Sequence, residues 1–129
     1  MKINSHRKLG KRSKIFLDYC ATHPNAGVRF HASDMMLVMH SNGSYLSEPE
    51  SKIRAAGHFY LSKINEKFNN GAVVTLSKII KHVMTSASEV ETAALFYNCK
   101  SAILLRIYLE EMRHPQPKTP VIIDSTSAQ

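Results

Sequence analysis

The feature of this sequence that most limits its fold is a long apolar stripe at helical spacing in the second half of the chain. The stripe begins near two overlapping capping boxes, Ser86-x-x-Glu89 and Ser88-x-x-Glu91, whose side chains can satisfy the free N–H groups of a first helical turn. We expect the helix to end at Arg113-His114-Pro115, because a proline prevents its continuation. The apolar positions of the stripe are Val90, Ala93, Ala94, Tyr97, Leu104, Leu105, Tyr108, Leu109 and Met112.

The segments on either side of this helix are short apolar runs typical of strands. Met35–Ser41 is too short for a helix and abuts Asn42-Gly43, a turn dipeptide. The other segments that we expect to be extended before the helix are Arg54–Leu61, Ala72–Leu76 and Ile79–Met84. A short buried strand, Val121–Ile123, follows the helix. Strands, then a long helix, then a closing strand predict a layered α/β or α+β fold.

Composition places the chain among single-domain globular proteins. Its 129 residues are enough for one core, and 43% of them are hydrophobic, which excludes disorder across the whole chain. No apolar run approaches the roughly 20 residues that span a bilayer. The basic N-terminus has no hydrophobic segment behind it, unlike a secretory signal. We therefore expect a soluble, intracellular protein, nuclear or cytoplasmic and not secreted, with no membrane partner.

The positive charge is concentrated at the N-terminus. Seventeen lysines and arginines against ten acidic residues give a net charge of +7, and six of the seventeen lie within the first fourteen residues. Such an arm is either a solvated, flexible terminus or a segment that binds phosphate or directs nuclear import. We expect residues 1–14 to be a disordered tail and residues 15–27 to be a connector, helical from Ile15 to Thr22 and then turning. The candidate nucleic-acid contacts in the tail are Lys8, Lys11, Arg12 and Lys14.

Cysteine and histidine patterns indicate neither a zinc site nor a disulfide framework. The two cysteines, Cys20 and Cys99, are far apart and form no Cys-x-x-Cys motif. Both lie among apolar residues, so we interpret them as small buried side chains. The seven histidines occur singly, and none pairs with another at the i, i+4 spacing of a helical metal site.

Three polar residues each stand where an apolar run meets a different kind of structure. Asn42 follows the first run, Glu91 lies near the start of the long helix, and Asp124 follows Val121–Ile123. If the two runs are neighbouring strands, Asn42 and Asp124 stand at strand ends, where ligand sites form in open sheets, and the helix adds Glu91. Three carboxylates would make a divalent-metal site, but this set holds two carboxylates and one amide. Taken singly, the three residues suit a hairpin turn, a helix cap and a turn after a strand.

Four segments carry motifs that occur together in one protein family. They are 36–49 (Met-Leu-Val-Met-His-Ser-Asn-Gly-Ser-Tyr-Leu-Ser-Glu-Pro), Arg54-Ala-Ala-Gly-His-Phe-Tyr-Leu61, Ser86-Ala-Ser-Glu-Val-Glu-Thr-Ala-Ala-Leu95 and Asp124-Ser-Thr-Ser-Ala128. In this order they resemble the ribonuclease H domain of copia-type retrotransposon polyproteins. That family has Ser-Asp-Ala-Ser-Tyr-Leu-Ser, Arg-Ala-Gly-Gly-His-Phe, Ser-Ser-Ala-Glu-Ala-Glu and Asp-Asn-x-x-Ala at the corresponding places. Leu17–Pro24 resembles its upstream connector, so the likeness runs from about residue 16 to residue 128.

The resemblance implies both a fold and a reaction. The implied fold is a ribonuclease H-like α/β domain over residues 28–129, a mixed sheet with one long helix on one face, C-terminally incomplete. In the family, an acidic quartet binds two Mg²⁺ ions, which drive hydrolysis of the RNA strand of an RNA–DNA hybrid. Carboxylates serve in this quartet because Mg²⁺ prefers anionic oxygen ligands.

The quartet is matched only in part. The resemblance implies that Asp124 and Glu91 are catalytic metal ligands, with Glu89 as the helix-capping residue. Asn42 stands at the position of the first-strand aspartate, where an amide oxygen replaces a charged carboxylate. The fourth acidic position of the family lies downstream of the region that corresponds to Gln129. We therefore expect weak or absent binding of Mg²⁺.

These differences indicate a degenerate or truncated domain with weak or no activity. A loss of ~3–4 kcal/mol of transition-state stabilisation at Asn42 lowers the rate by roughly 10²–10³. Neither Asp34, eight residues upstream, nor Glu48, in a following loop, is a convincing substitute. Two alternatives stay open. One is a noncatalytic module that binds nucleic acid, such as an RNA–DNA hybrid, through the basic tail and the sheet, and the other is a relic without a selected role.

Overall fold

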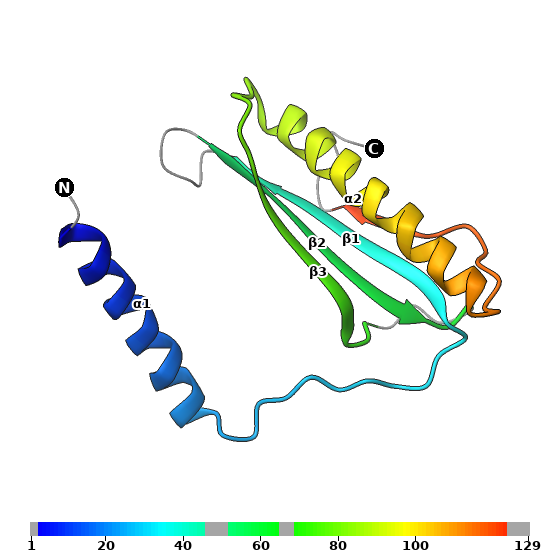
Figure 1. Cartoon of the computed structure of the whole chain (residues 1–129), viewed down its shortest axis with the longest axis horizontal. Helices are drawn as coiled ribbons and strands as arrows, with labels where there is room; N and C mark the ends of the chain where they lie inside the picture. Colours follow the sequence, from blue (N-terminus) through cyan, green and yellow to red (C-terminus); the bar gives the residue numbers. More distant parts are fainter. Residues whose placement is uncertain (1–2, 46–51, 65–68, 124–129) are drawn as a thin grey trace.

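The computed structural model describes residues 3–45, 52–64 and 69–123, the side chains of residues 3–9 excepted. Its elements, in chain order, are α1 (Ile3–Thr22), β1 (Met36–Ser44), β2 (Ile53–Ser62), β3 (Ala72–Ile80), α2 (Ala87–Glu111) and β4 (Val121–Ile123). The strands form one sheet in the order β3-β2-β1-β4, and α2 lies along one face of it (Figure 1). The predicted α/β architecture, a mixed sheet with a long helix on one face, is therefore confirmed within these ranges.

The sheet is mixed because its strands are connected in two ways. β1, β2 and β3 follow one another as antiparallel neighbours. α2 then carries the chain back along the sheet, so β4 reaches the free edge of β1 and pairs with it in parallel. Parallel neighbours need a long crossover of this kind, because the chain must return to the same end of the sheet. The long helix that the sequence predicts is that crossover.

The hydrophobic core lies between α2 and one face of the sheet. Successive side chains of a strand point to opposite faces, so Leu37 and Met39 of β1 point to the same side. There they meet Phe59 of β2 and Leu109 of α2. The second core cluster consists of Ile53, Ala55, Ile80, Val90 and Ala94. The two clusters attach both halves of α2 to the sheet. The predicted apolar stripe is wrong at Leu104, Tyr108 and Met112, which are exposed. They lie off the helix face that the sheet covers, whose buried positions are Val90, Glu91, Ala94, Asn98, Ala102 and Leu109.

Two glycines let the helix approach the strands closely. A Cβ atom on Gly43 of β1 would lie 2.8 Å from Val90 Cγ1 and 2.9 Å from the Val90 carbonyl oxygen. A Cβ atom on Gly57 of β2 would overlap the side chains of Asn98 and Phe59. Protein interiors have little spare room, so a methyl group at Gly43 must displace the backbone of α2 at Val90, and one at Gly57 must displace the side chains of Asn98 and Phe59. This close approach allows polar side chains of the helix to reach the backbone of the strands.

Both ends of α2 agree with the sequence pattern. Ser86 is the N-cap, and its side chain accepts a hydrogen bond from the N–H of Glu89 (3.2 Å). The Glu89 carboxylate accepts hydrogen bonds from the N–H (2.7 Å) and the hydroxyl (3.0 Å) of Thr85, and these bonds lower the pKa of Glu89. After the last turn, Arg113 adopts a φ of 66°, and Pro115 follows. The predicted capping role of Glu89 and the predicted end of the helix are confirmed, the latter within the usual fraying of a helix end.

The strands are longer than the sequence indicates. The turn predicted at Asn42-Gly43 is wrong, because both residues lie inside β1 and pair with Ala56 and Ala55 of β2. Cross-strand pairing and the contact of Gly43 with α2 outweigh the local preference of this dipeptide for a turn. β3 is also one continuous strand, Ala72–Ile80, where the sequence predicts two separate extended pieces. The strand predicted at Val121–Ile123 is present as β4, but the prediction that it is buried is wrong, because β4 is an edge strand and Val121 and Ile122 are exposed.

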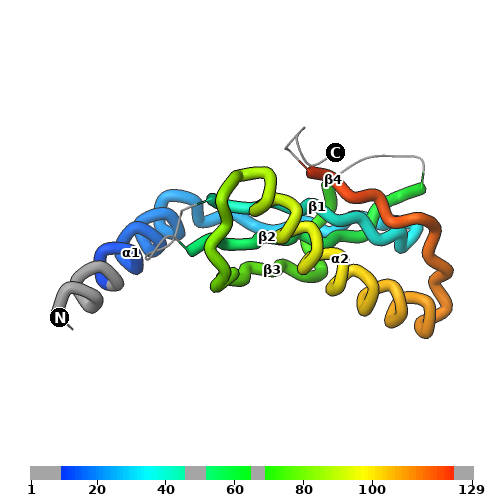
Figure 2. Tube along the Cα trace, turned by 90° about the horizontal axis from the view of Figure 1, so that it is seen from above, coloured from blue at the N-terminus to red at the C-terminus, as the bar shows by residue number. Residues whose placement is uncertain are grey.

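The N-terminal segment is helical, so the prediction of a disordered tail is wrong for residues 3–14. They continue into the predicted helix that ends at Thr22. The segment contains no proline and several residues of high helix propensity, while Gly10 costs only about 1 kcal/mol. The described side chains of α1 are all exposed, including Cys20, for which burial is the wrong prediction. The reason is that α1 stands apart from the sheet (Figures 1 and 2), whereas Cys99 packs half-buried against the core.

The chain between α1 and β1 is held against the sheet by Asn70. The amide oxygen of Asn70 accepts a hydrogen bond from the N–H of His31 (2.8 Å). Its amide nitrogen donates to the carbonyl oxygens of His31 and Leu61 (2.9 Å each). The N–H of Gly71 donates to the carbonyl oxygen of Arg29 (3.1 Å). These bonds place residues 29–31 beside the end of β2 and the start of β3.

Candidate functional site

Asn42 lies near the end of β1 on the face of the sheet opposite α2. Leu37 and Met39 pack toward the helix, so the alternation of side chains places Asn42 on the other face together with His40. The side chain of Asn42 is exposed, and its backbone pairs with Ala56 of β2. An amide at this position presents a neutral oxygen to solvent.

Glu91 is the predicted site residue that the fold buries. Only 7% of the residue is exposed, and its Oε2 atom accepts a hydrogen bond from the N–H of Gly43 (3.0 Å). Gly43 directly follows Asn42, so the helix carboxylate reaches the backbone of β1 one residue after Asn42, while the Asn42 side chain lies on the other face of the sheet. Glu89, by contrast, is exposed and bonded to Thr85 at the helix cap. The two glutamates therefore have different surroundings: Glu91 is buried against β1, and Glu89 is exposed at the helix cap.

The third predicted site residue, Asp124, lies outside the described residues. The strand that precedes it is described, and Ile123 pairs in parallel with Ser41, the residue before Asn42. Asn42 and Asp124 therefore each follow, in the sequence, one of two paired residues of β1 and β4.

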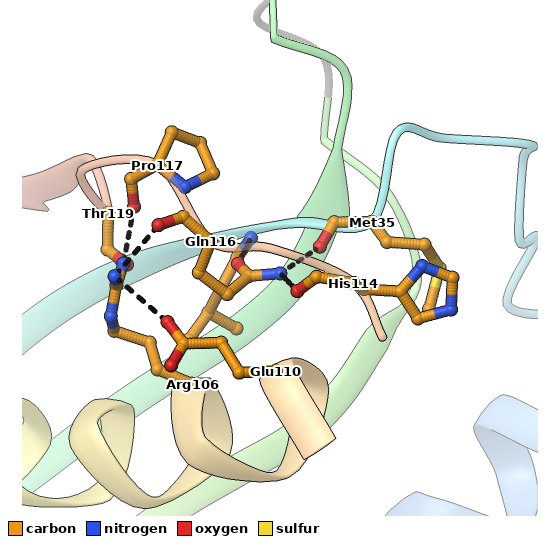
Figure 3. A network of polar contacts seen from close by, with 8 residues as sticks. Met35, Arg106, Glu110, His114, Gln116, Pro117 and Thr119 are labelled. Atoms are coloured by element: carbon orange, nitrogen blue, oxygen red, sulfur yellow. Dashed lines mark hydrogen bonds and ion pairs between the residues drawn. The ribbon is translucent and has the colours of Figure 1, made fainter. Parts of the chain in front are cut away.

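A polar network near the end of α2 sets the register of β4 (Figure 3). Gln116 donates from Nε2 to the carbonyl oxygen of Met35 (2.9 Å) and accepts at Oε1 from the N–H of Leu37 (3.0 Å). The partners of Arg106 on α2 are the carbonyl oxygens of Gln116 and Pro117, the hydroxyl of Thr119 and, as an ion pair, the carboxylate of Glu110. The network fixes the returning chain to the start of β1, so β4 can begin at Val121 opposite Met39.

Asn98 is a buried polar residue that the sequence analysis does not single out. It is fully buried, and its Nδ2 atom donates to the Ser41 hydroxyl and to the Ala56 carbonyl oxygen (2.8 Å each). Among the described residues, none donates a hydrogen bond to its Oδ1 atom. Asn98 lies seven residues after Glu91, on the same side of the helix. An asparagine in the apolar stripe is the signal that could reveal it, and its role is to tie α2 to β1 and β2 beside Asn42.

The described residues do not fit a centre of two Mg²⁺ ions. Mg²⁺ requires near-octahedral oxygen coordination and is usually held by carboxylates. The described donors are one carboxylate, from Glu91, and one amide, from Asn42, and the carboxylate already accepts the N–H of Gly43. In the described part of the chain, no group of three or more His, Cys, Asp or Glu residues could hold a metal ion. A metal-driven step does not follow from these residues.

The basic residues predicted to contact nucleic acid lie on α1, away from Asn42 and Glu91. Lys11, Arg12 and Lys14 are exposed. The backbone of Lys8 belongs to the same helix, and its side chain lies outside the described set. Because α1 stands apart from the sheet in both views, the fold does not bring these cations to the candidate site (Figures 1 and 2).

Comparisons with family models, with curated proteins and with solved structures found no match to this chain. None of the described helices is long and apolar enough to cross a membrane. The resemblance to copia-type ribonuclease H domains therefore stays a prediction. It rests on the four sequence motifs and is compatible with the mixed sheet and with the contact between Glu91 and β1.

Proposed function

We propose that this chain is a ribonuclease H-like domain of a retrotransposon polyprotein with a degenerate hydrolytic centre. The observation that carries the proposal is the hydrogen bond from the N–H of Gly43 to Glu91 (3.0 Å), which holds a buried carboxylate against the backbone of the residue that follows Asn42. The parallel pairing of Ser41 with Ile123 supports it, because the residue that follows each of them in the sequence is a position of the motif. The strand order β3-β2-β1-β4, with β4 parallel to β1, is compatible with such a fold.

The chemistry of position 42 explains why the centre is degenerate. The ancestral reaction is the Mg²⁺-dependent hydrolysis of RNA in an RNA–DNA hybrid. A carboxylate at this position would contribute a full negative charge, whereas the amide of Asn42 contributes a dipole only. A site with less negative charge attracts a divalent cation less strongly, so we expect weak or no cleavage.

The test is cleavage of a labelled RNA–DNA hybrid by the unaltered chain and by Asn42→Asp, in Mg²⁺ and in Mn²⁺. We expect little cleavage by the unaltered chain and a rate roughly 10²–10³ higher for Asn42→Asp if the carboxylate supplies ~3–4 kcal/mol. The matched control adds Glu91→Gln to Asn42→Asp and should cancel the gain. Robust cleavage by the unaltered chain would contradict a degenerate centre, and equal rates for the chain and Asn42→Asp would contradict the role of this position.

A second candidate function is noncatalytic binding of nucleic acid. The observation that favours it is the exposure of Lys11, Arg12 and Lys14 on one helix. Cations that neutralise phosphates give sequence-independent affinity that falls steeply with salt.

Salt-dependent binding to an RNA–DNA hybrid tests this candidate. Replacing Lys11, Arg12 and Lys14 together by alanine should make the slope of log affinity against log salt shallower by about 2–3. Lys81→Ala, an exposed lysine outside α1, is the control and should leave the slope nearly unchanged. Absence of binding at low salt would contradict this candidate and favour a relic without a selected role.

A further inference from the structure

The face of the sheet opposite α2 carries two histidines and a tyrosine side by side. His40 of β1 and His58 of β2 are direct partners in the antiparallel register, so their side chains point to the same face. Tyr60 stands two residues after His58 on that face. We propose that His40 and His58 form a binding site for one divalent transition-metal ion, with Tyr60 as the residue that positions His40. The site does not depend on the proposed function.

The two imidazoles are close enough to share an ion. The ring centroids of His40 and His58 are 6.3 Å apart, and the ring planes are at 88° to each other. Two imidazoles bound to one ion at ~2.0–2.1 Å per nitrogen have centroids on the order of 5–6 Å apart. Both side chains are half-buried. The strand pairing therefore holds the two rings at a separation close to that of two imidazoles bound to one ion.

Tyr60 orients the imidazole of His40. Its hydroxyl oxygen lies 3.2 Å from His40 Nε2, and its ring centroid lies 5.6 Å from that of His40. In the tautomer in which His40 Nε2–H donates to this oxygen, Nδ1 carries the lone pair that can bind an ion. Metal-binding histidines are usually oriented through their second nitrogen in this way.

Two imidazole nitrogens as ligands favour a transition-metal ion over Mg²⁺. Neutral imidazole suits Zn²⁺, Ni²⁺ and Cu²⁺, whereas Mg²⁺ prefers oxygen ligands. His58 also lines a cavity of about 830 Å³, whose other walls include Arg29, Asn70 and Thr75. None of the described residues that line this cavity is an aspartate or a glutamate. The cavity adjoins the site on the side of His58, and His40 is not among its described lining residues.

The test is a titration of the full chain, without a histidine tag, with ZnCl₂ or NiCl₂. Calorimetry measures the affinity for Zn²⁺ and Ni²⁺, and NMR of the imidazole signals in the Zn²⁺ titration identifies the histidines that respond. We expect one bound ion per chain and signal changes confined to His40 and His58. In His40→Gln and in His58→Gln we expect affinity weaker by about tenfold or more. MgCl₂ in place of the transition metal should produce no response of these signals.

The matched control is His82→Gln, because His82 is exposed and lies between β3 and α2, outside the cluster. It should bind the ion as tightly as the unaltered chain does. Circular dichroism of each variant verifies that the fold is kept, and glutamine preserves a polar side chain of similar reach. Equal affinity in the unaltered chain, His40→Gln and His58→Gln would overturn the site, as would absence of binding by the unaltered chain.

Tyr60→Phe tests the positioning role, because it keeps the ring and removes the hydroxyl. Loss of a hydrogen-bond partner behind a metal ligand typically weakens metal binding ~10–100-fold, so we expect a loss of about tenfold. The nitrogen chemical shifts of His40 should also show a changed balance of tautomers, which a purely structural role of Tyr60 would not produce. Unchanged affinity together with an unchanged balance of tautomers would overturn the positioning role.

Discussion

The two faces of the sheet are built from the same strands, yet one is closed by α2 and the other presents polar groups in its middle. On the closed face, Met39 and Phe59 pack with the helix and are fully buried. On the opposite face, their neighbours in the sequence, His40 and His58, are half-buried beside each other. Because side chains alternate along a strand, adjacent residues lie on opposite faces of the sheet and have different surroundings. Packing against α2 selects the residues of the closed face, whereas the open face combines the buried cluster of Met36, Val38 and Tyr60 with polar groups.

The candidate site lies where the two faces meet. Glu91 belongs to the closed side, because it comes from α2 and is buried. Asn42 belongs to the open side, where it is exposed. The N–H of Gly43 joins them, since it bonds to Glu91 while its residue directly follows Asn42. A change at either residue therefore tests a different side of the same site.

The largest expected effect on the free energy of unfolding is that of a substitution on the closed face, compared with one at the neighbouring residue on the open face. Phe59→Ala should lower the free energy of unfolding by about 3–5 kcal/mol, because it removes a fully buried ring from the core. His58→Ala should cost well under half of that amount, because His58 is half-buried on the open face. Urea denaturation of the two variants measures both values. Equal losses would mean that the two faces contribute alike to stability.

A smaller effect is expected where the closed face meets the helix. Gly43→Ala should lower the free energy of unfolding by about 1–3 kcal/mol, because the added methyl group collides with Val90. Gly27→Ala is the control, because a Cβ atom there meets nothing within 4 Å, and its effect should stay within about 0.5 kcal/mol. Thermal unfolding of both variants provides the measurement. If Gly43→Ala is as stable as the unaltered chain, the close approach of α2 to β1 is not a constraint.

The smallest effect concerns the helix cap and depends on pH. Hydrogen bonds from Thr85 lower the pKa of Glu89 in the folded chain, so its contribution to stability is present above the unfolded pKa and is lost as the pH falls through the folded pKa. Glu89→Gln should therefore be less stable than the unaltered chain at neutral pH and approach it in acid. Denaturation across this pH range measures the difference. A difference in stability between Glu89→Gln and the unaltered chain that stays constant across this pH range would contradict the linkage.

The sequence predicted the two ends of α2 correctly, because short-range signals define them. The capping box at Ser86 and the proline at position 115 delimit α2, and both act within a turn of the helix. The same kind of reasoning failed at Asn42-Gly43, where a turn dipeptide lies inside a strand. It also failed at residues 3–14, because charge suggested disorder while helix propensity favoured a helix.

The candidate site was predictable to a lesser degree than the fold. A capping box alone fits both Glu89 and Glu91, and the motif comparison singled out Glu91, which is the one that contacts β1. The contacts of Asn98 had no local signature beyond a polar residue in an apolar stripe. His40 and His58 are eighteen residues apart, a spacing that no short metal motif contains, so only the strand register brings them together.

The sequence by itself determined the bounds of α2 and the presence of strands on either side of it, because caps, prolines and periodicity act over a few residues. Only the tertiary structure decided that Glu91 meets Gly43 and that His40 faces His58. Those pairings follow from strand register and from the close packing of a helix on two glycines. Register is selected by burial over the whole sheet, since a shift of one residue would move every side chain to the other face.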